Sequence, residues 1–243
     1  MVGDDAGLVV PVPGPKPDGL AKRCLMAANL PDVDLLHKTL ARDGTFKSRN
    51  LFLSRLYYGY EHTATCLAGP FFGAPQAAVL LESLIVWGIS EVIFLGWCGS
   101  INDGVRTGDV ILPGRAWIDD GTSGNYRKPG MPGDAADPAA DLQLRLKTRL
   151  TGHGVDVREG PVWSTDAIFR ETPAKIQRFR EKGALAVEME AAALFAVGGY
   201  RGISVGNVLV VSDELSDAHW RPGFRNPVFK EQRRRICRIL ADF

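Results

Sequence analysis

Short apolar runs alternate along the chain with longer segments in which apolar residues recur every three or four positions. The short runs are rich in Val, Ile and Leu, as in strands of a parallel sheet that is buried on both faces. The longer segments have the spacing of helices that cover such a sheet. This alternation predicts an α/β fold. The predicted strands are Cys24–Ala28, Thr63–Ala68, Val92–Gly96, Asp109–Pro113, Val157–Ser164, Leu185–Met189 and Gly206–Ser212.

Proline and glycine mark the ends of the predicted helices. Proline suits the first turn of a helix because its missing N–H needs no partner there. Glycine favours the conformation that ends many helices, so Gly88, Gly183 and the Gly198–Gly199 pair are expected to end three of them. The predicted helices are Asp32–Arg42, Pro75–Trp87, Pro138–Gly152, Pro173–Lys182, Glu190–Val197 and Pro227–Leu240.

Three segments need separate interpretation. Residues 1–20 are rich in Pro and Gly and are expected to form a flexible arm before one domain at 21–243. Residues 119–137 are dense in Gly, Pro and Asp, which predicts a long surface loop that is either next to a ligand site or a plain connector. Lys230–Arg238 is basic, but apolar residues recur around it at helical spacing. We interpret it as the solvated face of a helix.

Charge and cysteine content narrow the choice of partners. Lys plus Arg (29) nearly equals Asp plus Glu (28), so no overall field attracts nucleic acid or anionic lipid. No apolar run is long enough to span a membrane, and the first residues lack the pattern of a signal peptide. The four cysteines have no metal-binding spacing. We therefore expect a cytoplasmic protein with reduced, mostly buried thiols and no metal, whose partners are small molecules and further copies of itself.

Two acids stand in an unusual place in Leu185–Gly199, where an apolar strand runs directly into an Ala-rich helix. Glu188 and Glu190 flank Met189 in this segment. Burying a carboxylate costs free energy unless hydrogen bonds or a ligand compensate for it. One interpretation is that the acids serve the start of the helix, where the macrodipole favours negative charge. The alternative is that they hold sugar hydroxyls at the carboxyl end of a strand.

Two further strand ends carry candidate chemistry. Ser212 and Asp213 follow an apolar strand at the position where α/β folds bind ligands, although Asp213 also suits a turn or helix cap. Phe94–Gly114 is a strand followed by several glycines that allow close approach of a ligand. That loop has neither the dinucleotide fingerprint nor the Walker pattern.

Taken together, the Leu185–Gly199 segment, the strand end at Ser212 and Asp213, and the Phe94–Gly114 segment resemble the nucleoside phosphorylase family. This family includes purine nucleoside phosphorylases, uridine phosphorylases and methylthioadenosine nucleosidases. The resemblance runs from Cys24 to the last residue. Its most specific parts are VEMEAAALFAV and VVSD, supported by GPFFGAP, GWCGSINDGVRTGDVILP and DDGTS. The resemblance implies a mixed sheet partly closed into a barrel with surrounding helices. It also implies a homo-oligomer, either a dimer or a trimer of dimers.

The resemblance implies that the two acids bind the sugar. By the family motif, Glu190 holds the ribose 2′- and 3′-hydroxyls, Met189 packs beneath the sugar and Glu188 is its neighbour. Cleavage of the ribose–base bond leaves an electron-poor sugar, which anionic groups stabilise. Glu190 is therefore expected to stay ionised.

The resemblance also implies that Asp213 protonates the departing base, with Arg221 or Arg225 in support. An acid is needed because the base leaves as an anion, and burial would have to raise the pKa of Asp213 for this task. Three more residues are assigned to the base by the family motif, namely Phe169 for stacking, Arg170 for an edge contact and Ser212. Phe169 is equally compatible with a core position. Asp213 favours purines over pyrimidines.

The phosphate site of the family is only partly present. The first loop reads Asn29–Asp32 without an Arg, Phe94 replaces a second Arg, and Trp97 replaces a hydroxyl residue. Arg49 matches the Arg that the family donates across a dimer interface, and with Gly96 and Trp97 it makes up the predicted phosphate site. Each lost charge-assisted hydrogen bond weakens phosphate binding by about 1.5–3 kcal/mol.

Three functions are compatible with this pattern. The first is phosphorolysis of a nucleoside to a free base and a pentose 1-phosphate in purine salvage, with phosphate as co-substrate and no other cofactor. The second is hydrolysis by water, although no N-terminal Glu stands where the family nucleosidases have one. The third is nucleoside binding without catalysis. Trp97 does not decide between them, because it can close the phosphate site or stack on a base.

Overall fold

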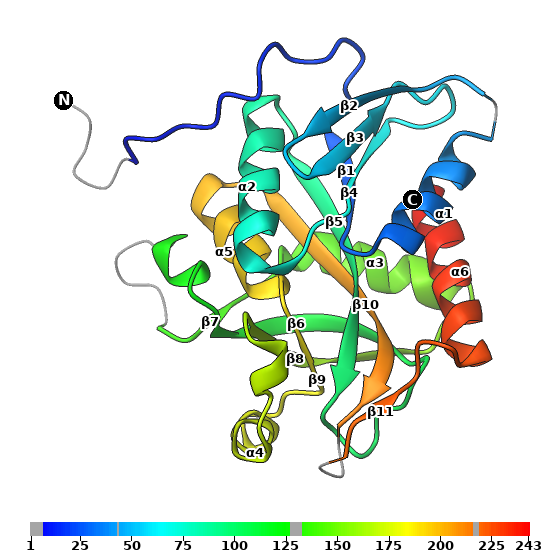
Figure 1. The fold of residues 1–243 in the computed structure, drawn as a ribbon. Helices are drawn as coiled ribbons and strands as arrows, with labels where there is room; N and C mark the ends of the chain where they lie inside the picture. Colours follow the sequence, from blue (N-terminus) through cyan, green and yellow to red (C-terminus); the bar gives the residue numbers. More distant parts are fainter. Residues whose placement is uncertain (1–6, 43, 127–132, 216–218) are drawn as a thin grey trace.

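One mixed sheet runs through the molecule, with helices on both of its sides (Figure 1). The computed structural model describes residues 7–42, 44–126, 133–215 and 219–243. The predicted α/β class is confirmed. The strands are β1 (Arg23–Ala27), β2 (Lys47–Leu51), β3 (Ser54–Tyr58), β4 (Thr65–Gly69), β5 (Glu91–Ser100), β6 (Val110–Asp119), β7 (Ala135–Ala136), β8 (Val157–Thr165), β9 (Ala186–Glu188), β10 (Ser204–Glu214) and β11 (Arg221–Pro222).

Part of the sheet closes on itself. The pairings run from β10 to β6, from β6 to β8, from β8 to β9 and from β9 to β5, and β5 pairs with β10 along most of its length. These strands form the barrel that the family resemblance implied. On the other side of β5, the sheet continues through β1, β4, β3 and β2. β5 and β10 are parallel, so their carboxyl ends lie together at one mouth of the barrel, where the short antiparallel strand β9 pairs with the last residues of β5.

The helices cover the two faces of the sheet in pairs. α1 and α6 pack together on one side, and α2 and α5 pack together on the other (Figure 1). Alternate residues of β1 face these two sides, since Cys24 and Met26 belong to the core under α2 and α5, whereas Leu25 and Ala27 belong to the other core. The helices are α1 (Leu30–Leu40), α2 (Gly73–Val86), α3 (Ala140–Gly152), α4 (Pro173–Glu181), α5 (Ala191–Arg201) and α6 (Pro227–Ala241), with 3-10 turns η1 (Ser123–Tyr126) and η2 (Ile168–Arg170).

The β2–β3 hairpin was absent from the predicted elements. Its first strand reads KSRNL and is mostly exposed, so it lacks the apolar pattern of a buried strand. Its two-residue turn is Phe52-Leu53, with Phe52 at a φ of 55°. Asn and Gly are the usual residues of such turns, so the sequence contains no hairpin signal there.

The prediction that Gly198 and Gly199 end a helix was wrong. α5 continues to Arg201 and ends at Gly202, which has a φ of 72°. Gly198 instead allows the helix to approach β10, because a Cβ at this position would lie 2.6 Å from Cγ2 of Val205. Gly88 and Gly183 do follow the ends of α2 and α4, as predicted.

Several smaller predictions concern the chain outside the sheet. The basic run lies on α6, where Phe229, Ile236, Ile239 and Leu240 are buried, which confirms the helical interpretation. The predicted 119–137 loop is shorter than expected, because β6 reaches Asp119 and both η1 and β7 lie within it, while residues 127–132 fall outside the described ranges. All four cysteines are buried and free, as predicted. No described helix combines the length and apolar character that crossing a membrane requires.

The described part of the N-terminal segment contains no helix or strand before β1. Two side chains of the domain hold its backbone. Trp87 Nε1 donates to the carbonyl of Gly14 (3.0 Å), and Arg49 Nη1 donates to the carbonyl of Pro15 (2.8 Å). The segment therefore lies against the end of α2.

Candidate active site

Glu188 binds backbone groups at the start of α5. Its Oε2 accepts hydrogen bonds from the backbone N–H groups of Glu190 (2.8 Å) and Ala191 (2.7 Å), and its Oε1 accepts from the hydroxyl of Ser164. These donors include unpaired N–H groups of the first helical turn. Burial nevertheless raises the pKa of Glu188 above its ordinary value. The contacts of Glu188 are therefore those of an acid that serves the start of a helix.

Glu190 has more capacity left for a ligand. Its Oε1 accepts a hydrogen bond from the backbone N–H of Gly73 (2.6 Å), and a backbone contact with Met189 also favours its ionised form. A carboxylate has about four lone-pair sites, so Glu190 keeps capacity for further donors. Burial raises the pKa of Glu190 first, and the neighbouring charge of Glu188 raises it further. The two acids of one turn thus have different contacts.

Asp213 is turned by an irregularity in its strand. In the pairing of β10 with β5, Val211 lies opposite Cys98 and Asp213 lies opposite Gly99, so Ser212 is an extra residue. Such bulges redirect side chains near binding sites. Gly99 leaves room for the acid, because a Cβ there would lie 3.2 Å from Asp213 Oδ2.

Two neutral groups donate to Asp213. The Ser212 hydroxyl donates to Oδ1 (2.6 Å), and the indole N–H of Trp220 donates to Oδ2 (2.8 Å). Burial raises the pKa of Asp213 more than these hydrogen bonds lower it. Of the two arginines that the sequence singled out as its support, Arg221 contacts Glu214 (3.4 Å) and Arg225 is exposed. Neither lines the cavity around Asp213.

One cavity of about 480 Å³ lies at the barrel mouth, a volume within the usual range for small-molecule sites. Met189 lines it between the two acids, and Phe169 lies at its rim with 96% of its surface exposed, which excludes the core interpretation. Arg170 is exposed and does not line it. The predicted site residues that line this cavity are Trp97, Phe169, Glu188, Met189, Glu190, Ser212 and Asp213.

Several lining residues were not predicted from the sequence, and three of them add aromatic or acidic groups. Trp220 and Phe224 add aromatic surface, and Glu171 adds a further carboxyl group. Burial, and then the charge of Asp213, raises the pKa of Glu171 to about 7. Glu171 lies just beyond the Phe169-Arg170 pair, so its position next to predicted site residues was the available signal.

On the side where the family motif predicts phosphate, Asp32 and Arg233 neutralise each other. Asp32 is fully buried, and its Oδ1 accepts from Nε (2.8 Å) and Nη2 (2.6 Å) of Arg233. Its Oδ2 accepts from Trp97 Nε1 (2.5 Å), and the guanidinium of Arg233 lies 4.7 Å from the Trp97 ring centre. Burial raises the pKa of Asp32, although Arg233 opposes this effect. Trp97 therefore links the cavity wall to a buried ion pair.

The other predicted phosphate residues lie away from the cavity. Arg49 holds the N-terminal segment and stacks over Trp87, with 5.3 Å from its guanidinium carbon to the ring centre. Gly96 is packed in the barrel, where a Cβ would lie 2.6 Å from Cζ of Phe94. No Lys, Arg or His from the described ranges lines the cavity.

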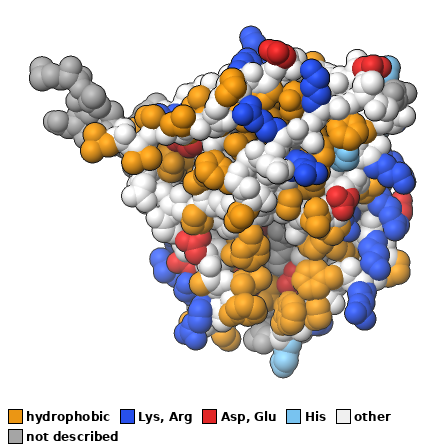
Figure 2. Space-filling view, turned by 45° about the horizontal axis from the view of Figure 1, so that its top comes forward, with side chains coloured by type: hydrophobic (Ala, Val, Ile, Leu, Met, Phe, Trp, Pro, Cys, Tyr) orange, Lys and Arg blue, Asp and Glu red, His pale blue; other side chains and the backbone are white. Residues whose placement is uncertain are grey.

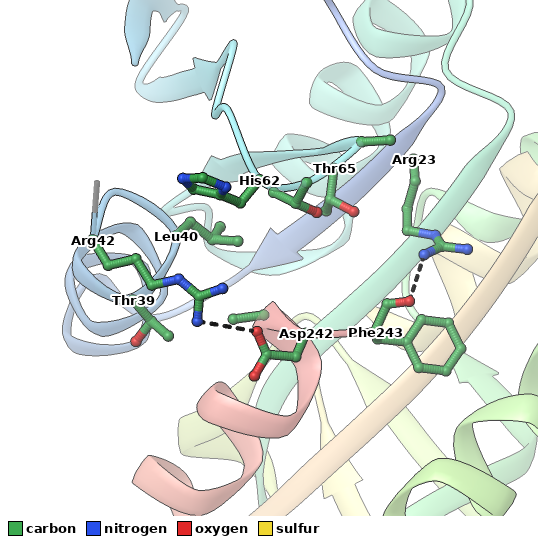
Figure 3. A pocket seen from close by; sticks show the side chains of 11 residues that line it. Arg23, Thr39, Leu40, Arg42, His62, Thr65, Asp242 and Phe243 are labelled. Atoms are coloured by element: carbon green, nitrogen blue, oxygen red, sulfur yellow. Dashed lines mark hydrogen bonds and ion pairs between the residues drawn. The ribbon is translucent and has the colours of Figure 1, made fainter. Parts of the chain in front are cut away.

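A second cavity lies between the carboxyl ends of α1 and α6 (Figure 3). It contains two arginines that have partners, since Arg23 donates to the carbonyl of Phe243 (2.8 Å) and Arg42 lies 3.6 Å from Asp242. None of the candidate site residues lines it. Within the residues that the structure describes, no group of three or more His, Cys, Asp or Glu side chains is arranged to hold a metal ion.

Comparison with known proteins places these features in a family. The sequence model of the phosphorylase superfamily matches residues 22–243. A DeoD-type purine nucleoside phosphorylase from Bacillus cereus is 31% identical over 159 residues. That match covers 64% of this chain and 66% of the relative, which is slightly less than two thirds of its length.

Solved structures share the fold. Uridine phosphorylase from Vibrio fischeri superposes with a TM-score of 0.76 at 22% identity, over 91% of this chain and 90% of that one. AMP nucleosidase from Bacteroides thetaiotaomicron superposes with a TM-score of 0.70 at 21% identity, over 92% of this chain and 89% of that one. At these identities the likeness concerns the fold alone.

Proposed function

The chain belongs to the phosphorylase superfamily, and on that premise we propose that it cleaves the N-glycosidic bond of a purine nucleoside. The observation that supports this proposal is that Glu190 and Asp213 line one cavity of about 480 Å³. Relatives named as purine nucleoside phosphorylase and uridine phosphorylase agree with it. In this proposal, Asp213 serves the base and Glu190 serves the sugar.

Asp213 is suited to the role of proton donor. When the bond between the sugar carbon and the base nitrogen breaks, its electron pair goes to the base. A protonated Asp213 then delivers its proton to the base, which leaves neutral. Burial raises the pKa of Asp213, and its Ser212 and Trp220 partners carry no positive charge that would strongly oppose this.

Glu190 is suited to the role of sugar ligand. Two hydroxyls on the pentose can donate to its carboxylate, and such hydrogen bonds favour the ionised form over the protonated one. The resulting negative charge lies close to the electron-poor sugar of the transition state and stabilises it. Met189, buried between the two acids, supplies an apolar surface beneath the ring.

The nucleophile that receives the pentosyl group has two candidates. Phosphate as acceptor gives a pentose 1-phosphate and is the form of the proposal that the names of the phosphorylase relatives favour. Water as acceptor gives a free pentose and is favoured by the lack of Lys, Arg and His among the described residues of the cavity wall. The contact of Trp97 with Asp32 also occupies the side that the family motif assigns to phosphate.

Base release from a nucleoside panel, measured with and without phosphate, tests the proposal. Release that requires phosphate and produces a sugar 1-phosphate supports phosphorolysis. Equal release in both conditions, with a free pentose as product, supports hydrolysis. Binding of nucleosides with no release of base from any of them would overturn the catalytic proposal.

We further propose that the chain acts in the cytoplasm as a homo-oligomer, with residues 1–20 as an arm outside the catalytic domain. Four buried free thiols agree with a reducing compartment. Figure 2 shows many exposed hydrophobic side chains spread over one face of the molecule, as expected for a surface that a second copy covers. Molar mass from light scattering tests the oligomer, because a monomeric mass at micromolar concentration contradicts it.

A further inference from the structure

Glu171 is a carboxyl group of the cavity without a protein partner. It follows η2, is partly buried and lines the same cavity as Asp213. Its carboxylate accepts no hydrogen bond and forms no ion pair with any described residue. By contrast, Glu188 and Asp213 each accept at least two hydrogen bonds. Glu171 therefore has acceptor capacity that the protein does not use.

The residues of the cavity wall leave the acceptor oxygens of Glu171 available to a ligand. Ile168, Phe169 and Trp220 give the wall of this cavity aromatic and aliphatic surface, and its other described charged residues are the acids Glu188, Glu190 and Asp213. No cationic side chain of the described cavity wall can neutralise it. A partly buried carboxylate without a partner is unfavourable, and a donor on a bound molecule removes that cost.

We propose that Glu171 determines base specificity, by accepting a hydrogen bond from an amino group next to the base nitrogen that Asp213 protonates. This inference rests on the proposed function. Asp213 and Glu171 line the same cavity, and the charge of Asp213 reaches Glu171, so a base that binds against Asp213 can present its neighbouring substituent to Glu171. On one edge of a purine, the ring nitrogen N7 lies beside the exocyclic substituent. An amino group there donates to Glu171, whereas an oxo group presents a second acceptor.

The test compares two nucleosides that differ in this substituent. Adenosine carries the amino group and inosine carries the oxo group. We measure kcat/KM by base release and Kd by calorimetry for both, at about pH 8, where a carboxyl with a pKa of about 7 is mostly ionised. The wild type is expected to favour adenosine by about 10–100-fold, the range for one charge-assisted hydrogen bond.

Glu171→Gln is expected to reduce the adenosine preference to within a few-fold of unity, because the amide can turn either its donor or its acceptor toward the base. Glu181→Gln is the matched control, since this exposed acid of α4 bonds Gln177 outside the cavity. The control should keep the wild-type preference.

The outcomes separate this inference from the proposed function. An unchanged preference in Glu171→Gln, or a wild type that favours inosine, overturns the role of Glu171 even if both nucleosides are cleaved. If neither nucleoside is cleaved but the Kd ratio still depends on Glu171, the catalytic proposal fails and the selection role stands. Absence of binding by either nucleoside contradicts both.

Discussion

The charged groups at two parts of the cavity wall have different partners. At the Glu190 and Asp213 end, the carboxyl groups have only neutral partners and retain capacity for a ligand. At the Trp97 end, Asp32 and Arg233 neutralise each other beneath the indole. The carboxyl groups at the first end therefore remain able to bind a ligand, whereas the charges at the second end neutralise each other within the protein. A substitution should therefore affect mainly catalysis at one end and mainly stability at the other.

Asp213→Asn gives the largest expected effect on activity. The amide is close in size to the acid but cannot deliver a proton to the base, so kcat should fall by about 10²–10⁴-fold. Nucleoside binding should change little, because the sugar contacts are not altered. Steady-state kinetics and calorimetry measure the two quantities. A variant with the wild-type kcat would remove Asp213 from its assigned role.

Asp32→Ala gives the largest expected effect on stability. It leaves the Arg233 guanidinium and the Trp97 N–H without their buried acceptor, and removing one member of a buried ion pair costs about 3–5 kcal/mol. Urea denaturation measures the loss in the free energy of unfolding. Asp34→Ala, an exposed acid on the same helix, is the control and should change it by less than about 0.5 kcal/mol. Equal stability of the two variants would contradict the proposed role of the buried pair.

Glu190→Gln and Glu188→Gln separate the two acids of one turn. Glu190→Gln should lower kcat/KM by about 10–100-fold through weaker sugar contacts. Glu188→Gln should instead lower the free energy of unfolding by about 1–3 kcal/mol, because the amide places N–H groups against the donors of the α5 start. Kinetics and denaturation of both variants check this division. The reverse pattern would show that Glu188 is the sugar ligand.

Glu190→Gln should also change how the stability of the ligand-free enzyme depends on pH. Burial raises the pKa of Glu190, so the folded state holds more protons than the unfolded state above the ordinary value of 4.5. Wild-type stability should therefore fall as the pH rises from that value through the raised pKa. Glu190→Gln should flatten this fall, with thermal melting curves similar near pH 5 and a higher Tm than the wild type near pH 9. An equal difference in Tm between the two proteins at pH 5 and pH 9 would contradict the raised pKa.

Trp220→Phe gives the smallest expected effect. It removes a neutral donor that favours the ionised form of Asp213, so the pKa of Asp213 should rise further. Because the acid must be protonated to act, the alkaline limb of the kcat profile should move to higher pH by up to about one unit, as expected for one neutral hydrogen bond. A pH–rate profile detects the shift. Movement of that limb to lower pH would argue against this contact.

Local sequence patterns were enough to predict most of the fold and the positions of Glu188, Glu190 and Asp213. Apolar strands that end in acids are visible in a contiguous stretch, as at Glu188 and Asp213. The Asp32–Arg233 pair was not predictable in this way, because its members are far apart in the sequence and Arg233 lies within a run of basic residues. Trp220 was not predicted, because the family motif implies an arginine beside Asp213. The β2–β3 hairpin was missed because its strands and turn lack the usual residues.

The two indoles of the cavity wall have a practical consequence. The chain has five tryptophans, and Trp97 and Trp220 are the ones that line the cavity. Both emit light whose intensity depends on their immediate surroundings, and a base that stacks beside them would quench it. Occupancy can therefore be followed optically on the unlabelled protein, and replacing Trp220 would leave Trp97, which neighbours the same Phe224 ring, as the remaining reporter.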